Sequence, residues 1–224
     1  MKKIFGPIFA IFWKDVLLET RTKDLVSTVL VFSLLVMVIF NFAIDPTPQI
    51  IGLVAPGILW IAFVFGGILG FGRSFTIENQ GKSLLALLLS PMSREQIFWG
   101  KVLTNLFMMI TVELICLPIF VVLFNITFDV LLLLPYLALA TIGIATLGTL
   151  FSAMAVNTRS KEVMLPLLFL PVVIPVIIAA VESSIIIIGG GEFSAALKWI
   201  PFLVAVDAIF LVLSPIAFNI IVQD

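Results

Sequence analysis

Long apolar segments alternate with short polar ones along the 224 residues of this chain. A helix that crosses a hydrocarbon core roughly 30 Å thick needs about 20 mainly apolar residues. Six segments meet this requirement: residues 25–44, 50–72, 102–124, 130–156, 163–181 and 201–222. The pattern predicts an all-α integral membrane protein in which six transmembrane helices form a single domain over residues 1–224.

The first 24 residues are apolar at three- and four-residue intervals, with charged positions between them. This spacing predicts an amphipathic helix over residues 3–23 that lies in the cytoplasmic membrane interface. The two lysines and the apolar run at the start resemble a signal peptide, but no small-residue cleavage site follows them. We therefore expect this segment to be retained.

A short amphipathic helix is predicted between the second and third spans, at about residues 77–89. Thr76 can cap it, Glu78 lies in its first turn, and Ser90-Pro91 ends it. Its apolar face includes Leu84, Leu85 and Leu88, and Gly81 lies near its start. Geometry alone leaves two interpretations open: an interfacial linker helix, or a docking element through which a cytoplasmic motor pushes on the membrane helices.

Ser93 and Gln96 form an S-x-x-Q capping box for the next helix. That helix is predicted to run from Arg94 to Phe124, which is about 46 Å at 1.5 Å per residue. It is longer than the membrane is thick, so its first turns must project from the bilayer.

Composition supports a membrane protein, because 62% of the residues are hydrophobic, only 11% are charged and the mean hydropathy is +1.31. Eleven of the 12 lysines and arginines fall on one side of the six spans if both termini are cytoplasmic. On the other side, DPTPQ and NITFD predict tight turns. The connection over 182–200 is long enough for a short helix at the outer interface, with Lys198 and Trp199 as anchors, and a plain glycine-bearing loop is the alternative.

The residues available for chemistry are few. The chain has no histidine, a single cysteine, Cys116, and no GxxxxGK[ST] motif. These absences exclude an internal disulfide, a Cys/His metal cluster and a phosphate-binding loop for ATP. We expect no catalytic residues, no metal and no bound cofactor, so that a partner supplies any energy from ATP.

Two carboxyl groups, Glu113 and Asp207, fall inside spans. An ionised carboxylate at this depth costs at least about 2.5 kcal/mol, so such groups usually face a cavity or the bundle interior. A substrate pathway or proton site is one interpretation, and a protonated structural carboxyl is the other. In the fifth span, Pro166, Pro171 and Pro175 indicate either a hinge or a static kink.

Five sequence pieces carry a resemblance to a known family. They are KDVLLETRTKDL at 14–25, PQIIGLVAPGILWIA at 48–62, LLLSP at 87–91 followed by GKV at 100–102, LFLPVVIPVII at 168–178 and LSPIAF at 213–218. In order and spacing they resemble CcmB, the permease subunit of the cytochrome c maturation system. The order of elements also resembles a type-2 ABC exporter, with an elbow helix, a coupling helix and six spans. The chain departs from the family at Gln80-Gly81-Lys82 and in its carboxyl-terminal Val-Gln-Asp.

The resemblance implies a non-catalytic permease in the inner membrane of a bacterium, serving haem delivery or the release of a haem-loaded chaperone. The implied partners are a CcmA-like P-loop ATPase, a CcmC-like haem-handling subunit and a CcmE-like haem chaperone, and no nucleic acid. The coupling helix would contact the ATPase through Glu78, Gly81, Leu84, Leu85, Leu88 and Pro91. We expect partners to hold the haem, since this chain lacks histidine and its Cys116 and Tyr136 lie inside spans.

Three alternatives stay open. The first is a type-2 ABC permease for another substrate, such as a lipid, a glycan or a drug. The second is a proton-coupled secondary transporter that uses Glu113 and Asp207, which the lack of a visible inverted repeat disfavours. The third is a structural membrane scaffold.

Overall fold

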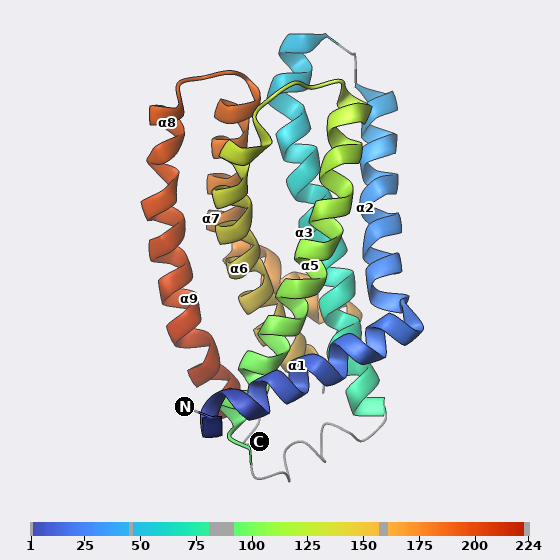
Figure 1. Cartoon of the computed structure of the whole chain (residues 1–224), viewed down its shortest axis with the longest axis vertical. Coiled ribbons are helices and arrows are strands. Elements are labelled where there is room, and N and C mark those ends of the chain that lie inside the picture. Colours follow the sequence, from blue (N-terminus) through green and yellow to red (C-terminus); the bar gives the residue numbers. More distant parts are fainter. Residues whose placement is uncertain (1, 45–46, 81–91, 157–160, 222–224) are drawn as a thin grey trace.

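Six long helices form an antiparallel bundle in the computed structural model, which describes residues 2–44, 47–80, 92–156 and 161–221 (Figure 1). The six are α2 (Asp24–Ala43), α3 (Pro48–Gln80), α5 (Arg94–Phe124), α6 (Val130–Ala155), α7 (Lys161–Ile188) and α9 (Trp199–Ile221). Helix α1 (Lys2–Thr22) precedes them, and the short α8 (Phe193–Leu197) comes just before α9. The described residues contain no strand.

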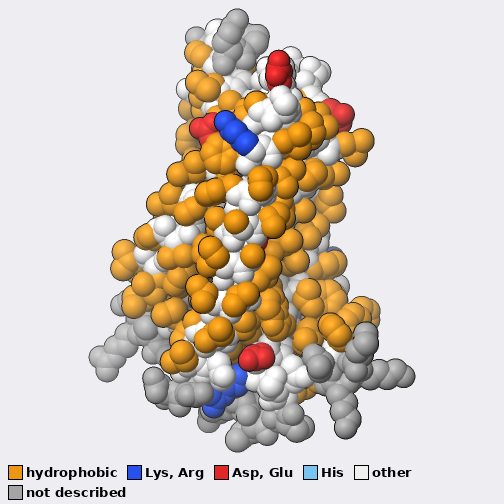
Figure 2. All heavy atoms as spheres, turned by 90° about the vertical axis from the view of Figure 1, so that its left-hand side faces the viewer, with side chains coloured by type: hydrophobic (Ala, Val, Ile, Leu, Met, Phe, Trp, Pro, Cys, Tyr) orange, Lys and Arg blue, Asp and Glu red, His pale blue; other side chains and the backbone are white. Residues whose placement is uncertain are grey.

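The predicted membrane fold is confirmed, because six helical segments are long and apolar enough to cross a bilayer. Figure 2 shows a broad hydrophobic belt, with the visible charged side chains near the two ends of the molecule. Large apolar side chains are exposed over the described chain, among them Phe42 at 85% and Val122 at 80%. Such exposure suits contact with lipid and would be unfavourable in water.

Helix α1 lies across the front of α5, from the end of α9 to the start of α2 (Figure 1). Its Ile8 and Ile11 are buried, whereas Phe5, Phe9 and Trp13 are exposed at four-residue intervals. The predicted amphipathic helix is therefore present. We call the end of the bundle that carries α1 the α1 end; the start of α1 and the end of α9 both lie there.

Helix α6 packs within the bundle and contacts α3, α5, α7 and α9. Small residues on it allow close approach: an added Cβ at Gly148 would collide with the ring of Phe71 on α3. Polar groups in the core find partners on neighbouring helices. Ser152 on α6 donates to the Phe71 carbonyl at 2.6 Å, and Ser33 on α2 donates to the Ala62 carbonyl at 3.1 Å.

The fifth span is longer than predicted, because α7 continues past Val181 to Ile188. The residues Glu182, Ser183 and Ser184 have the composition of a loop, but both serines are buried. Ser184 donates to the Ala180 carbonyl at 2.6 Å and accepts a hydrogen bond from Trp60 Nε1 at 2.9 Å. The helix ends at Ile188, and in the turn that follows, Gly190 has a φ of +71°, which favours glycine.

The predicted short helix before the last span is present as α8, with Lys198 Nζ 5.5 Å from the centre of the Trp199 ring. The three prolines of the fifth span, Pro166, Pro171 and Pro175, all lie inside α7, which is helical from Lys161 to Ile188. Their predicted role as a hinge or kink stays a prediction.

Candidate functional site

The segment predicted to couple the chain to a motor lies between α3 and α5 in the sequence, and α3 ends and α5 begins at the α1 end (Figure 1). Its residues Gly81, Leu84, Leu85, Leu88 and Pro91 lie outside the described residues. Glu78 belongs to α3, which continues without interruption to Gln80. A helix start at Thr76 was therefore wrong: between Phe71 and Gln80 no proline interrupts the helix, and continuation gives each backbone N–H its i−4 carbonyl.

The start of α5 confirms the capping prediction. Ser93 accepts a hydrogen bond from the Gln96 backbone N–H, and the Gln96 side chain accepts one from the Ser93 N–H at 3.0 Å. The helix then runs for 31 residues to Phe124, as predicted. A well-capped, uninterrupted helix thus begins directly after the coupling segment.

The base of α5 is tied to the end of α9. Arg94 Nη1 donates to the carbonyl and to the side-chain oxygen of Asn219, both at 3.3 Å, and the rings of Phe98 and Phe218 lie 5.3 Å apart. These two rings belong to a hydrophobic cluster separate from the main core, which we call the α1-end cluster. It comprises Ile11, Ile97, Phe98, Val102, Leu150, Ala153, Val156 and Phe218.

A buried ion pair joins α1 to α5 beside this cluster. Lys101 Nζ donates to Asp15 Oδ2 at 2.8 Å, and both side chains are buried. In the sequence, Lys101 comes directly before the third predicted span, and nothing there connects it with Asp15. The sequence does hold one sign that Lys101 is buried. It follows Ile97 and Phe98 by four and three residues, which places all three on one face of the helix, and that face is buried.

The two intramembrane carboxyl groups lie against opposite sides of α6. Glu113 Oε1 accepts a hydrogen bond from Thr141 at 2.7 Å, and Asp207 Oδ1 lies 2.5 Å from where a Cβ would be at Gly143. Residues 141 and 143 differ by about 3 Å along a helix and about 200° around it. The carboxyl groups are therefore at nearly the same depth, with α6 between them.

Each carboxyl group has oxygens without a hydrogen-bond partner among the described residues: Glu113 Oε2 and both oxygens of Asp207. Both side chains are buried. Neither lines the two cavities described next. Their role in a substrate pathway or as a proton site thus stays a prediction.

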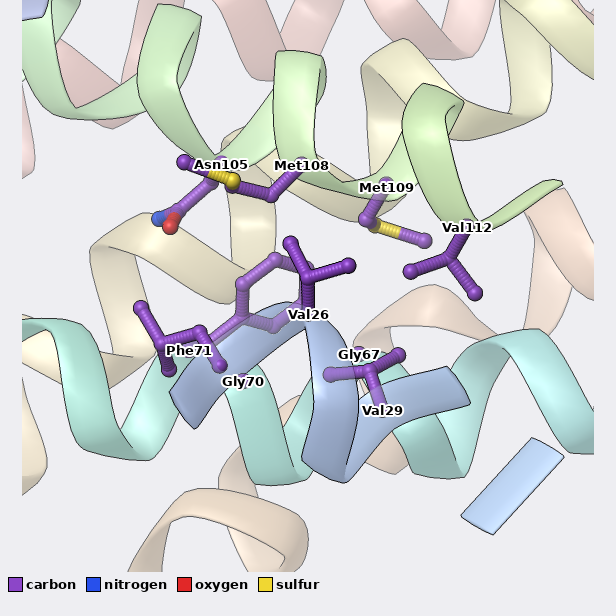
Figure 3. Close-up of a pocket in the computed structure, with 10 residues that line it drawn as sticks. Val26, Val29, Gly67, Gly70, Phe71, Asn105, Met108, Met109 and Val112 are labelled. Carbon is purple, nitrogen blue, oxygen red and sulfur yellow. The ribbon is translucent and has the colours of Figure 1, made fainter. Parts of the chain in front are cut away.

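A small cavity lies between α2, α3 and α5 (Figure 3). Val26 and Phe71 lie on one side of it, and Met108 and Met109 of α5 on the other (Figure 3). Its one amide, Asn105, already donates to Thr149 at 2.9 Å. At about 20 Å³, it has room for roughly one water molecule and holds no large substrate in this conformation.

A larger recess of about 670 Å³ lies at the end opposite α1. The ends of α2, α5 and α7 meet there, through residues that include Asn41, Leu123 and Gly189. The lining residues carry no ionisable side chain. In the described part of the chain, no three Cys, Asp or Glu residues are grouped so that they could hold a metal ion.

These features define a multi-pass α-helical membrane protein whose sequence has no ATP-binding motif. A family model described as "CcmB protein" matches residues 7–223. The chain belongs to the CcmB family, as its sequence pieces indicated.

Several relatives share the name "Heme exporter protein B". The protein of Pseudomonas aeruginosa is 27% identical over 97% of this chain and 95% of its own length. The Rhodobacter capsulatus protein is 28% identical over 77% of this chain and 80% of its own length. The Haemophilus influenzae protein is 32% identical over 66% of this chain and 68% of its own length.

Proposed function

We infer that this chain is the permease subunit of an ABC transporter that serves haem export and cytochrome c maturation. The observation that carries this function is the family match over residues 7–223, together with relatives named as haem exporters over nearly the full chain. The six spans suit a subunit of a membrane transporter. They do not by themselves select a substrate.

In this proposal, a cytoplasmic P-loop ATPase binds the segment between α3 and α5. The sequence lacks a phosphate-binding loop, so hydrolysis has to occur in another subunit. We assign the contact to Glu78, Gly81, Leu84, Leu85, Leu88 and Pro91. The capped base of α5 supports this assignment, because a rigid helix that starts directly after the segment can transmit its displacement into the bundle.

We place the α1 end in the cytoplasm and the protein in the bacterial inner membrane. Both ends of the described chain lie at the α1 end (Figure 1), as do Lys14, Arg73, Arg94 and Lys101. At the opposite end, Lys198 is the one Lys or Arg in the described connections. By the positive-inside rule, the end with more Lys and Arg residues faces the cytoplasm.

We propose that other subunits hold the haem iron: a haem-handling membrane protein and a haem chaperone. Stable haem ligation usually requires an axial His, Met, Cys or Tyr. This chain has no histidine, and its Cys116 and Tyr136 side chains are buried in the bundle. Methionines such as Met109 line the small cavity as ordinary apolar filler.

The test is a Leu88→Asp variant, expressed with the ATPase subunit in a strain that lacks its own copy of this permease. We expect the variant to reach wild-type levels in the membrane, to lose the ATPase on purification and to lose cytochrome c maturation. Asn157→Asp, in the connection between α6 and α7, adds the same charge at the same end and is the matched control. A Leu88→Asp variant that still binds the ATPase and matures cytochrome c would remove the segment from its assigned role.

A further inference from the structure

Helix α5 follows the coupling segment directly, so its contacts with other helices bear on where a displacement of that segment goes. Lys101 lies seven residues after Arg94, about 10.5 Å along the helix. Its side chain is only 1% exposed and lies between α1 and α5. Asp15 on α1 accepts from Lys101 Nζ at 2.8 Å and also pairs with Lys14 Nζ at 3.0 Å.

The backbones of α1 and α5 are in close contact beside this pair. A Cβ added at Gly100 would lie 2.8 Å from the Cβ of Ile11 and 3.2 Å from the carbonyl oxygen of Ile8. About two turns further along α5, the rings of Phe12 and Phe107 meet edge to face, with centroids 5.6 Å apart. Along α5, close contacts with α1 thus lie on both sides of Lys101.

The other end of α1 is fixed to α2. The buried Glu19 accepts a hydrogen bond through Oε1 from the backbone N–H of Val26 at 2.8 Å. That N–H belongs to the first turn of α2, where helix donors lack an intrahelical partner. Between them, Lys23 makes the turn with a positive φ of 56°. Helix α1 thus connects the base of α5 to the start of the first span.

We propose that Asp15 and Lys101 are positioning residues for energy coupling, which make α1 move with α5 so that displacement of the coupling segment reaches α2. This inference rests on the proposed function. A buried ion pair adds little stability over an apolar pair of similar volume, but it fixes one pairing of the two helices. Apolar contacts already hold α1 on α5, so the role of the ion pair is to fix how the two helices are aligned along each other.

The first test compares Lys101→Met with Lys14→Met, which removes the same charge from a side chain that is 46% exposed. Each variant is expressed with the ATPase subunit, and ATP hydrolysis by the purified complex and cytochrome c maturation in cells are both measured. We expect Lys101→Met to retain hydrolysis and to lower cytochrome c maturation relative to that hydrolysis by about tenfold, within the range of known coupling effects. Lys14→Met should match the wild type. An unchanged ratio in a stably inserted Lys101→Met complex contradicts the inference.

The second test leaves the ion pair intact, because removing Lys101 also leaves Asp15 without its buried partner. Ile11→Cys and Gly100→Cys are combined with Cys116→Ser, so that the two new thiols can form a disulfide between α1 and α5. Their Cβ positions are 2.8 Å apart, about 1 Å closer than in a disulfide, so the bond forms after a small shift of the helices. If α1 moves with α5, the oxidised protein keeps the ATP-dependent activity that the same variant has when reduced. A block that a reductant relieves would show that the helices must separate, and would overturn the inference.

The two proposals fail in different ways. If the unaltered chain neither binds an ATPase nor supports cytochrome c maturation, the proposed function is wrong. If the unaltered chain does both, and Lys101→Met behaves like Lys14→Met, the proposed function stands and only the coupling role of the ion pair is lost.

Discussion

The carboxyl group of Asp207 on α9 occupies the space that a side chain at Gly143 on α6 would fill, with Oδ1 2.5 Å from the position of the missing Cβ. The Cγ2 atom of Val176 on α7 lies 3.3 Å from the same Cβ position. The contact between α6, α7 and α9 therefore depends on glycine at residue 143.

Gly143→Ala should destabilise the bundle, because the new methyl group must displace the Asp207 carboxyl. Overpacking of this kind costs about 1–3 kcal/mol, and we expect a lower unfolding temperature in detergent. Gly57→Ala on α3 is the matched control, since a Cβ there has no atom within 4 Å. Equal unfolding temperatures for the two variants would contradict the close contact.

Asp207→Leu should preserve or raise the unfolding temperature. The branched side chain of leucine has nearly the shape of aspartate, and it removes two buried oxygens that have no partner among the described residues. Replacing buried polar groups with apolar ones of the same shape is close to neutral or stabilising. A marked loss of stability would indicate that Asp207 is bound to a group outside the described structure.

Thr141→Val should lower stability by roughly 1–3 kcal/mol, because Glu113 then loses the donor at Oε1 and stays buried. Glu113→Leu combined with Thr141→Val should recover much of that loss, since both partners become apolar. Unfolding of the two single variants and the double variant, compared as a cycle, measures the coupling between the side chains. Additive effects would mean that the hydrogen bond contributes nothing.

Single cysteines in a Cys116→Ser background test the orientation. Thr47→Cys and Thr127→Cys, at the end opposite α1, should react with an impermeant maleimide in intact cells that have a permeabilised outer membrane. Ser83→Cys and Ser160→Cys should react only after the inner membrane is opened. Labelling of Ser83→Cys from outside would reverse the topology.

The purified subunit should bind no haem tightly by itself. A haem titration followed by optical spectroscopy should give no stoichiometric low-spin spectrum, because this chain offers no histidine and buries Cys116 and Tyr136. If such a spectrum is seen, its loss in Cys116→Ser or Tyr136→Phe would identify the ligand.

Features set by local sequence were predicted correctly. The six spans follow from the length of the apolar runs, and the start of α5 follows from the Ser93–Gln96 capping box. The ends of α3 and α7 were placed too early, because residues such as Thr76, Ser183 and Ser184 suit a loop as well as a helix. In α7, hydrogen bonds to Ala180 and Trp60 satisfy the serine hydroxyls inside the bundle.

The ion pair between Asp15 and Lys101 could not be predicted from spacing. The two residues are 86 positions apart, and a lysine near the start of a long helix ordinarily lies in the polar region outside the membrane. Only the crossing of α1 over α5 brings them together. The same crossing explains why Gly100 is needed, since its neighbours in space are Ile8 and Ile11 of α1.

We expect the exposed aromatic stripe of α1 to set how deeply the protein sits in the bilayer. Phe5, Phe9 and Trp13 are exposed on a helix that lies across the bundle (Figure 1), and an apolar face of this kind inserts into the membrane interface. We then expect a change in bilayer thickness to be absorbed at the opposite end, where α2 and α3, and α5 and α6, are joined by connections of only a few residues. Under the proposed function, we expect the lipid environment to alter the recess side of the protein before it alters the side to which we assign the ATPase.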